Sequence, residues 1–396
     1  MKKKSIENID VKGKRVFLRV DFNVPLNDAQ EITDDTRIKS TLPTIQYLVE
    51  HGAKIVCASH LGRPDGKEKP DLSLKPVAQR LSKLLGRDIQ FPGKITGKEI
   101  DDAKSRLKEG EILLLQNLRF NPGETANDPD FARELAKDID IYVNDAFGAS
   151  HRAHASIEAI TRLVPITCAG LLVKKEIEFL SLALENHTKN YIVILGGAKV
   201  SEKIPLIQNL MNKAQKILIG GAMAYSFLKA KGFDVGRSEV EEDELQTCKN
   251  IMETASQKNI KLLLPVDHIA AHTVEPEVTI RMIKKDEGIP DGMMGLDIGF
   301  ETIQLYVQEL KGADLIFWNG PLGVFEIDTF SAGTIEIARA IASGSATTIV
   351  GGGDTISAIN KAGVADQITH LSTGGGAALK FLSGLKLPGI ESLPNE

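Results

Sequence analysis

The chain has 396 residues, 42% of them hydrophobic and 26% charged, as in a globular protein long enough for two or three domains. The net charge of −5 argues against a strongly basic nucleic-acid-binding protein, and three widely spaced cysteines argue against a disulfide framework or a cysteine-rich metal site. No apolar run could span a membrane, and the basic start leads into no apolar signal segment. We therefore expect a cytoplasmic protein with neither nucleic acid nor membrane as a partner.

Arginine and glycine are distributed unevenly along the chain. Eleven of the 14 arginines lie in residues 1–184, whereas 24 of the 35 glycines lie in residues 185–396. The arginine side chain is suited to binding carboxylate and phosphate groups. Clustered glycines allow the backbone to approach a ligand closely. Each half of the chain therefore has a composition that could serve an anionic ligand.

Short apolar runs with helical patterns between them predict parallel strands in the first half. The predicted strands occupy residues 15–20, 53–58, 111–115 and 139–143. The second half repeats the plan with predicted strands at 191–195, 216–219, 261–266, 314–318, 347–350 and 368–371. Between the halves, residues 171–185 have the apolar spacing of one long helix. This alternation predicts two α/β domains with parallel sheets, connected by that helix.

Arginines follow three of the predicted strands in the first half. Ligands of open α/β sheets bind at the carboxyl ends of the strands, so Arg63, Arg119 and Arg152 should converge on one rim. Together with Arg37 and His60 they predict a site for a small molecule with phosphate or carboxylate groups.

Asp21 and Asn23 follow the first predicted strand and leave two interpretations open. Both residue types form turns, and Pro25 follows them. Alternatively, an acid beside an arginine cluster could accept a hydrogen bond from a substrate hydroxyl.

Glycine turns follow four predicted strands of the second half and predict a nucleotide site. Backbone amides at the start of the following helices could donate to phosphate groups. Neither a Walker A loop nor a G-x-G-x-x-G fingerprint is present, so the site must use other loops. The turns contain Gly196 and Gly197; Gly220 and Gly221; Gly351, Gly352 and Gly353; and Gly374, Gly375 and Gly376.

Charged residues near these turns have alternative interpretations. Lys199 and Lys203 are expected on one face of a helix that begins after the first turn, either contacting phosphate or forming a solvated face. Asp354 could bind the magnesium that accompanies a nucleotide or could be a helix N-cap. Glu326 could bind ribose hydroxyls or be an ordinary exposed acid.

Long motifs spread over both halves resemble the phosphoglycerate kinase family. One departure is Gln116, where the family usually has glutamate. The motifs are RVDFNVP at 19–25, SHLGRP at 59–64, NDAFG at 144–148, HRAH at 151–154, GGAKV at 196–200, FWNGP at 317–321, GGGDT at 351–355 and STGGGA at 372–377.

The resemblance implies reversible, Mg²⁺-dependent phosphoryl transfer from 1,3-bisphosphoglycerate to ADP, giving 3-phosphoglycerate and ATP in glycolysis. It implies a monomer with two Rossmann-like domains joined by a long hinge helix. The expected parts are a phosphoglycerate-binding domain (1–170), the hinge (171–187), a nucleotide-binding domain (188–384) and a C-terminal segment (385–396) that returns to the first domain. The alternatives are an NAD-dependent dehydrogenase and a non-catalytic anion-binding protein.

The resemblance also implies roles for individual residues. Arg37, Lys199 and the amides of Gly374, Gly375 and Gly376 are expected at the transferred phosphoryl group, and Asp354 at the metal. The residues expected to bind phosphoglycerate are Asp21, Asn23, Arg37, His60, Arg63, Arg119 and Arg152. The residues expected to bind the nucleotide are Gly197, Ala198, Lys203, Gly220, Gly221, Gly295, Asn319, Pro321, Glu326, Gly351, Gly352, Gly353, Asp354 and Thr355.

Overall fold

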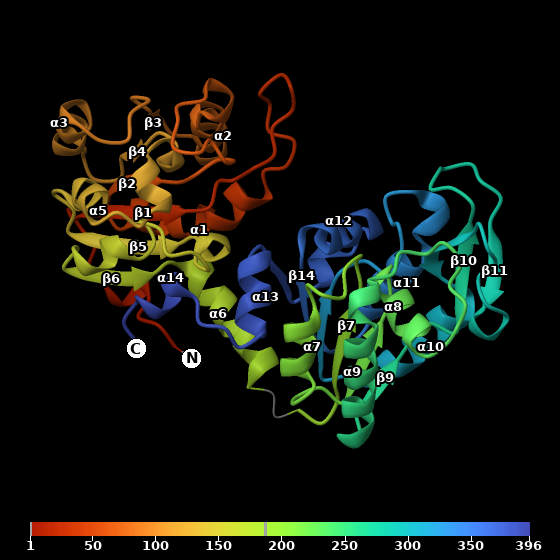
Figure 1. The fold of residues 1–396 in the computed structure, drawn as a ribbon. Helices are drawn as coiled ribbons and strands as arrows, with labels where there is room; N and C mark the ends of the chain where they lie inside the picture. Colours follow the sequence, from red (N-terminus) through yellow and green to blue (C-terminus); the bar gives the residue numbers. More distant parts are fainter. Residues whose placement is uncertain (1, 186–187) are drawn as a thin grey trace. The chain divides into compact units, whose positions relative to one another are not determined.

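The computed structural model describes residues 2–185 and 188–396, and its chain divides into two compact units (Figure 1). The first unit combines Met1–Glu178 with Lys386–Glu396, and the second is Phe179–Leu385. Helix α6 (Leu171–Leu184) occupies the predicted connector, whose last two residues, 186 and 187, lie outside the described ranges. Each unit is therefore built around its own sheet and is described by itself.

The first unit contains a six-stranded, wholly parallel sheet in the order β3-β4-β2-β1-β5-β6. The four strands predicted from apolar runs are all present. The two that were not predicted, β3 and β6, are short edge strands with partly exposed side chains, so they lack a continuous apolar run. The strands are β1 (Arg15–Val20), β2 (Lys54–Ala58), β3 (Ile89–Gln90), β4 (Ile112–Leu114), β5 (Ile141–Asp145) and β6 (Ile166–Ala169).

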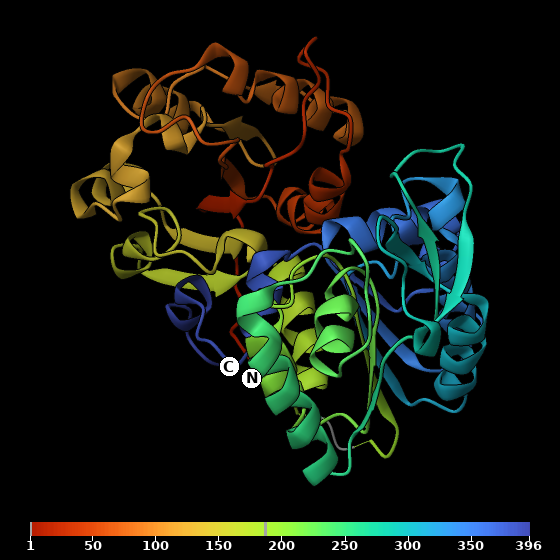
Figure 2. The same cartoon turned by 45° about the vertical axis from the view of Figure 1, so that its right-hand side comes forward.

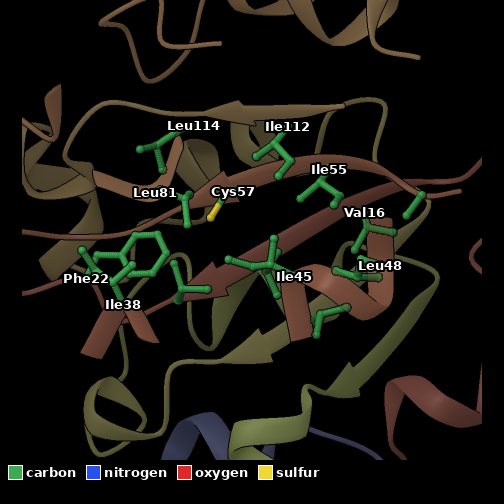
Figure 3. Packing of buried hydrophobic residues seen from close by; sticks show 14 of the residues in the cluster. Val16, Phe22, Ile38, Ile45, Leu48, Ile55, Cys57, Leu81, Ile112 and Leu114 are labelled. Atoms are coloured by element: carbon green, nitrogen blue, oxygen red, sulfur yellow. The ribbon is translucent and has the colours of Figure 1, made fainter. Parts of the chain in front are cut away.

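Helices pack against this sheet through apolar stripes. In α1, Ile38, Ile45 and Leu48 are spaced at three to seven residues, and all three are buried against the sheet (Figure 3). The chain leaves α1 through Gly52, whose positive φ of 71° suits glycine. The helices are α1 (Thr36–Glu50), α2 (Lys75–Leu85), α3 (Lys98–Arg106), α4 (Pro122–Thr125), α5 (Pro129–Ala136) and α14 (Pro388–Glu391), with the short 3-10 helix η3 (Leu118–Phe120) after β4.

The last residues of the chain belong to the first unit. The backbone N–H of Gly389 donates to Ser150 O (2.9 Å), and Gly389 O accepts from Asn144 Nδ2 (2.9 Å). A side chain at Gly389 would lie 2.6 Å from Ile157, so glycine is needed for this close approach. The C-terminal segment therefore supports the loop that follows β5, close to the N-terminus of the chain (Figure 1).

The second unit contains a six-stranded parallel sheet in the order β15-β14-β13-β7-β8-β9, whose strands overlap all six predicted runs. Trp318 of β13 is fully buried at its centre. The sheet also has a smaller neighbour that was not predicted, an antiparallel sheet in the order β11-β10-β12 (Figure 2). The strands are β7 (Tyr191–Leu195), β8 (Lys216–Ile219), β9 (Lys261–Leu263), β10 (Asp267–Ala271), β11 (Arg281–Lys284), β12 (Met294–Ile298), β13 (Leu315–Asn319), β14 (Thr347–Gly351) and β15 (His370–Ser372).

Helices lie between successive strands of the parallel sheet of the second unit, as the parallel connections require, and α13 follows its last strand. They are α7 (Ile204–Leu210), α8 (Met223–Ala230), α9 (Leu245–Gln257), α10 (Phe300–Leu310), α11 (Ala332–Ala342), α12 (Gly353–Ala362) and α13 (Gly376–Leu382). The predicted class, an α/β protein with parallel sheets flanked by helices, is confirmed.

Asp145, at the end of β5, caps the N-terminus of α6. Its Oδ1 accepts hydrogen bonds from the backbone N–H groups of Leu172 (2.9 Å) and Val173 (3.3 Å). A Cβ at Gly170 would lie 2.2 Å from this oxygen, which explains the glycine before the helix. Burial of the carboxyl group raises the pKa of Asp145 to about 7.

Replacing Asp145 with asparagine should flatten the dependence of stability on pH. Between about pH 4 and pH 7 the folded state holds a proton on Asp145 that the unfolded state has lost, so stability falls as pH rises. The slope should reach about 1.4 kcal/mol per pH unit for this one group. Asparagine stays neutral, and its Oδ1 can still accept hydrogen bonds from the N–H groups of the helix. The Asp145→Asn variant should therefore lose the pH-dependent part of the stability that this carboxyl group contributes.

Urea unfolding between pH 4 and pH 8 measures the effect. Asp140→Asn is the matched control, since Asp140 also accepts a backbone N–H, from Arg15 (2.7 Å), but is only half-buried. Asp297 also has a pKa raised to about 7 and should leave a residual slope in both variants. The same slope in Asp145→Asn as in the parent would contradict the prediction.

Candidate functional site

A cavity of about 320 Å³ in the first unit is lined by the arginines that follow three strands. Arg63 follows β2, Arg119 lies in η3 after β4, and Arg152 follows β5. His154 completes this set of basic side chains. The structure thus brings together the three arginines that were predicted to converge because they follow the carboxyl ends of parallel strands.

Arg119 is poised to bind an anion in this cavity. Its Nη1 donates to Gly62 O (2.7 Å), while its buried Nε has no hydrogen-bond partner among the described residues. Burial, together with the neighbouring charges of Arg152 and Arg19, lowers the pKa of Arg119 to about 10. A buried N–H without a partner is costly, and an anionic ligand would satisfy both the donor and the charge.

Four other predicted substrate residues, Asp21, Asn23, Arg37 and His60, are not among those that line this cavity. Arg37, at the start of α1, donates from Nη1 to Asp21 Oδ2 (2.9 Å). Asn23 accepts from the backbone N–H of Gly62 (2.8 Å) through Oδ1, and its own N–H donates to Asp21 Oδ1 (3.3 Å). Apart from local hydrogen bonds such as this one, residues 21–25 form no regular turn, and the substrate role of Asp21 and Asn23 stays a prediction.

A buried polar network that the sequence reasoning missed lies beneath these residues. Arg19 donates from Nε to Ser156 Oγ (2.7 Å) and contacts His60 Nδ1 through Nη2 (3.3 Å). Ser156 in turn donates to Glu124 Oε1 (2.6 Å), which lies 3.8 Å from Arg19 Nη2. The only available signal was a charged residue inside an otherwise apolar strand, because a buried charge requires partners.

Asn117 and Gln116 hold the loop that carries Arg119. Asn117 Oδ1 accepts from the N–H groups of Leu61 (3.1 Å) and Arg119 (3.1 Å). Gln116 Oε1 accepts from the N–H groups of Leu74 (3.0 Å) and Asn117 (2.8 Å). Its Nε2 donates to Ser73 Oγ (3.0 Å). The family that the motifs resemble usually has glutamate at this position, and a glutamate carboxylate could only accept a hydrogen bond from the serine.

In the second unit, hydrogen bonds tie together the loops that follow β7, β13 and β14. Buried Lys203 donates to Asn319 Oδ1, and Asn319 Nδ2 donates to Gly351 O (2.7 Å). The N–H of Gly320 donates to Thr355 Oγ1 (2.7 Å). Burial lowers the pKa of Lys203 to about 8. Several predicted nucleotide residues thus form one connected set.

The predicted placement of Lys199 and Lys203 on one helix face is wrong. Helix α7 begins only at Ile204, with Lys203 at its N-cap and Lys199 exposed in the preceding loop beside Ala198. Pro205 explains the late start, because proline fits the first turn of a helix but not its interior. The loop is also held by Ser201, whose N–H donates to Glu241 Oε2 (2.9 Å).

The glycine turns prove to be of two kinds. A Cβ at Gly196 would lie 2.1 Å from Pro321 O, and one at Gly221 would lie 2.6 Å from Gly197 N. These glycines, and likewise Gly220 against Leu322, are required for packing between loops rather than for open approach to a ligand. No atom outside the local backbone would lie within 4 Å of a Cβ added at Gly353, Gly375 or Gly376. These three glycines therefore have open space beside them, as does Gly197, whose added Cβ would meet nothing nearer than Gly320 Cα at 4.0 Å, whereas Gly374 is buried.

Asp354 is the second residue of α12, and its N-cap interpretation is wrong because Gly352 occupies that position with a φ of 99°. The carboxylate is exposed in the first turn of the helix. Within residues 2–185 and 188–396, no group of three or more histidine, cysteine or acidic residues could hold a metal. The donor set fits magnesium, which usually takes one or two carboxylates and completes its shell with phosphate oxygens and water.

Gly295 belongs to the antiparallel sheet, and Glu326 lies in the loop after β13. Gly295 belongs to β12, and a Cβ there would lie 1.9 Å from Tyr225 Oη, so the glycine is needed for packing. Val324 N–H donates to Leu296 O (2.9 Å), which places the loop of exposed Glu326 beside this strand.

Comparisons with known proteins agree with this arrangement. The family model described as phosphoglycerate kinase matches residues 6–385. Phosphoglycerate kinases of Thermosipho africanus and Koribacter versatilis are 53% and 51% identical, and each alignment covers 99–100% of both chains. No helix of the described ranges is long and apolar enough to cross a membrane.

Solved structures give the same result. The phosphoglycerate kinase of Coxiella burnetii superposes with a TM-score of 0.88 at 39% identity, covering 98% of each chain. That of Pyrococcus horikoshii has a TM-score of 0.87 at 36% identity with the same coverage. The fold, the two groups of residues and the full-length similarity together show that the chain belongs to the phosphoglycerate kinase family.

Proposed function

We propose that the cavity lined by Arg63, Arg119 and Arg152 binds phosphoglycerate and that the loops around Lys203 and Asp354 bind the nucleotide. Family membership makes the chain a phosphotransferase between 1,3-bisphosphoglycerate and ADP, and the comparisons support neither a dehydrogenase nor a non-catalytic anion-binding protein. The observation that carries the proposal is the convergence of three arginines on one cavity.

The transfer itself requires positioning and charge stabilisation more than covalent chemistry. The attacking oxygen of ADP already carries negative charge, so no general base is needed. Arg37, Lys199 and the amides of Gly374–Gly376 are proposed to donate to the equatorial oxygens of the transferred group. Magnesium held by Asp354 and the nucleotide phosphates would neutralise charge on the nucleotide.

The proposed substrate sites lie in different units, so catalysis requires them to come together. We propose that motion occurs at α6 and its flanks and that closure excludes water, which would otherwise hydrolyse the acyl phosphate. X-ray scattering should show a smaller radius of gyration when both substrates are added. A cytoplasmic location and a monomeric state remain predictions from the family resemblance.

A coupled assay tests the proposed function directly. Purified protein should phosphorylate 3-phosphoglycerate in the presence of ATP and Mg²⁺, and chelation of the metal should abolish turnover. Absence of activity in folded protein would contradict the proposal. Titration with NAD, which should produce no binding signal, separates the kinase from a dehydrogenase.

Arg63→Ala should chiefly weaken phosphoglycerate binding. Arg63 is exposed at the cavity, so its removal costs the fold little while removing a charge-assisted contact worth about 1.5–3 kcal/mol. We expect the KM for 3-phosphoglycerate to rise by about 10- to 100-fold. Arg106→Ala is the control, because Arg106 is an exposed arginine on α3. An unchanged KM for Arg63→Ala would remove this residue from the site.

Asp354→Asn should raise the Mg²⁺ concentration needed for half-maximal activity. The exposed carboxylate has no role in capping α12, so the variant should fold normally. Asp366→Asn, at an exposed carboxylate of the same unit, is the control and should leave the requirement unchanged. Magnesium titrations of steady-state activity provide the measurement, and identical curves for Asp354→Asn and the parent would exclude Asp354 as the ligand.

A further inference from the structure

Arg19 makes an unusual contact with the ring of His60. The Arg19 side chain is fully buried, and its Nη2 lies 3.3 Å from His60 Nδ1. The guanidinium is fixed from its other sides by Ser156 Oγ (2.7 Å from Nε), by the carbonyl of Val20 and by Glu124 (3.8 Å). These contacts hold the guanidinium of Arg19 in one orientation, with Nη2 next to Nδ1 of His60.

This contact determines which ring nitrogen carries the proton. A guanidinium has five N–H donors and no acceptor, so His60 Nδ1 must offer a lone pair to Arg19. The proton of the neutral ring then resides on Nε2. Asp21 does not compete for it, because its Oδ1 is 3.8 Å from Nδ1 and its Oδ2 is engaged by Arg37.

The surroundings of His60 also oppose a second proton on the ring. Burial and nearby positive charge hold the pKa of His60 well below its usual range. The charged and titratable groups that face it are Arg19 from β1, Asp21 after β1, Arg37 from α1, Arg119 from η3 and His154 after β5. Asp21 is the single acid of this set, and the ring therefore stays neutral.

The remaining nitrogen, Nε2, has no partner within the described residues and keeps slight exposure, although His60 does not line the described cavity. The side chain of His60 is 4% exposed, and Nε2 is not among the fully buried polar atoms of those residues. A neutral ring with its proton on Nε2 can only donate there. Oxygen atoms of a carboxylate, phosphate or hydroxyl would accept this hydrogen bond.

We infer that Arg19 is a positioning residue that holds His60 as the neutral tautomer protonated at Nε2, so that His60 presents phosphoglycerate with a donor only. This inference rests on the proposed binding of phosphoglycerate beside Arg119. Arg19 acts through His60 and through no direct contact with the ligand. Its effect should therefore be visible in the free protein before any substrate is added.

The first test is ¹⁵N NMR of the histidine rings in the free, wild-type protein. His60→Gln assigns the His60 signals by their disappearance. We expect the shift pattern of a neutral ring protonated at Nε2, unchanged from pH 6 to pH 8. A ring protonated at Nδ1, or one that titrates within this range, would overturn the inference.

The second test uses Arg19→Met, in which the donor to Nδ1 is lost. His60 should then titrate between pH 5 and pH 8 or change tautomer toward Asp21. The KM for 3-phosphoglycerate should rise about tenfold, the loss expected for one charge-assisted hydrogen bond, and should become pH-dependent. In a His60→Gln background, whose amide donor has no tautomers, Arg19→Met should add no pH dependence.

Glu124→Gln controls for a merely structural role of the buried pair. It removes the charge opposite Arg19 while leaving the contact with His60, so its ring signals should match the wild type even if stability falls. Equal changes of the ring signals in Glu124→Gln and Arg19→Met would overturn the inference. If Arg19→Met does not fold, the wild-type and Glu124→Gln spectra still decide the tautomer.

The results separate this inference from the proposed function. Failure of phosphoglycerate to bind wild-type protein would contradict the proposed function and, with it, the role of Arg19 in binding, whereas the spectra of the free protein test the tautomer alone. The expected spectrum combined with an unchanged, pH-independent KM in Arg19→Met would overturn the positioning role while leaving the proposed substrate site intact.

Discussion

Arg37→Ala should lower kcat by about 10²- to 10³-fold, the loss typical of one preorganised donor to a transition state. In the free protein its guanidinium donates to Asp21 (2.9 Å), and its side chain is 36% exposed. An ion pair this exposed contributes at most about 1 kcal/mol to stability, so the fold should persist. Steady-state kinetics with both substrates, together with thermal unfolding, measure the two effects separately.

Arg80→Ala provides a matched control for this variant. Arg80 on α2 also pairs with an aspartate, donating from Nε (2.9 Å) and Nη2 (2.6 Å) to Asp35 Oδ2. It lies outside the proposed site and should leave turnover unchanged. Arg37→Lys should recover only part of the lost activity, because lysine lacks the planar fork of the guanidinium. Near-normal turnover of Arg37→Ala would remove Arg37 from the mechanism.

Lys199→Ala should produce a decrease in kcat of similar size, about 10²-fold or more, with little effect on nucleotide binding. Lys199 is exposed in the loop before α7, so its removal leaves no buried group unpaired. The proposed role in following the transferred phosphoryl group requires an ammonium that is free to move. Single-turnover kinetics should show a slower chemical step at saturating substrates.

Lys213→Ala is the control for Lys199. It removes another exposed lysine of the same unit, and turnover should match that of the parent. A loss of nucleotide affinity without a slower chemical step in Lys199→Ala would assign Lys199 to ground-state binding instead.

The parallel sheets could be predicted because their central strands are continuous apolar runs. The antiparallel sheet of β10, β11 and β12 could not, because β11 has three exposed residues of four and so carries no apolar signal. The start of α7 could have been placed correctly from Pro205, whose ring excludes the residue from a helix interior. Pro205 was thus a usable signal for the start of α7, whereas the exposed residues of β11 gave no apolar signal.

The residues of the candidate site also divide into those that could be predicted from the sequence and those that could not. Arg63, Arg119 and Arg152 could be grouped because each follows the carboxyl end of a predicted parallel strand, and these ends meet at one edge of a sheet. Arg19 and Glu124 could not be paired, since their contact depends on side-chain packing across distant parts of the chain. The two kinds of glycine turn differ only in what the neighbouring loop places against them, which the residue type does not reveal.

The return of the C-terminal segment also affects when the site is completed during synthesis. The ribosome makes Arg152 and its loop before the second unit, but Gly389, which bonds to Asn144 and Ser150, is made only after the whole second unit. A nascent chain that has released the whole second unit still lacks this support. The first unit therefore lacks this support until residues 386–396 have been made, and a chain cut before residue 386 should carry an unsupported anion cavity.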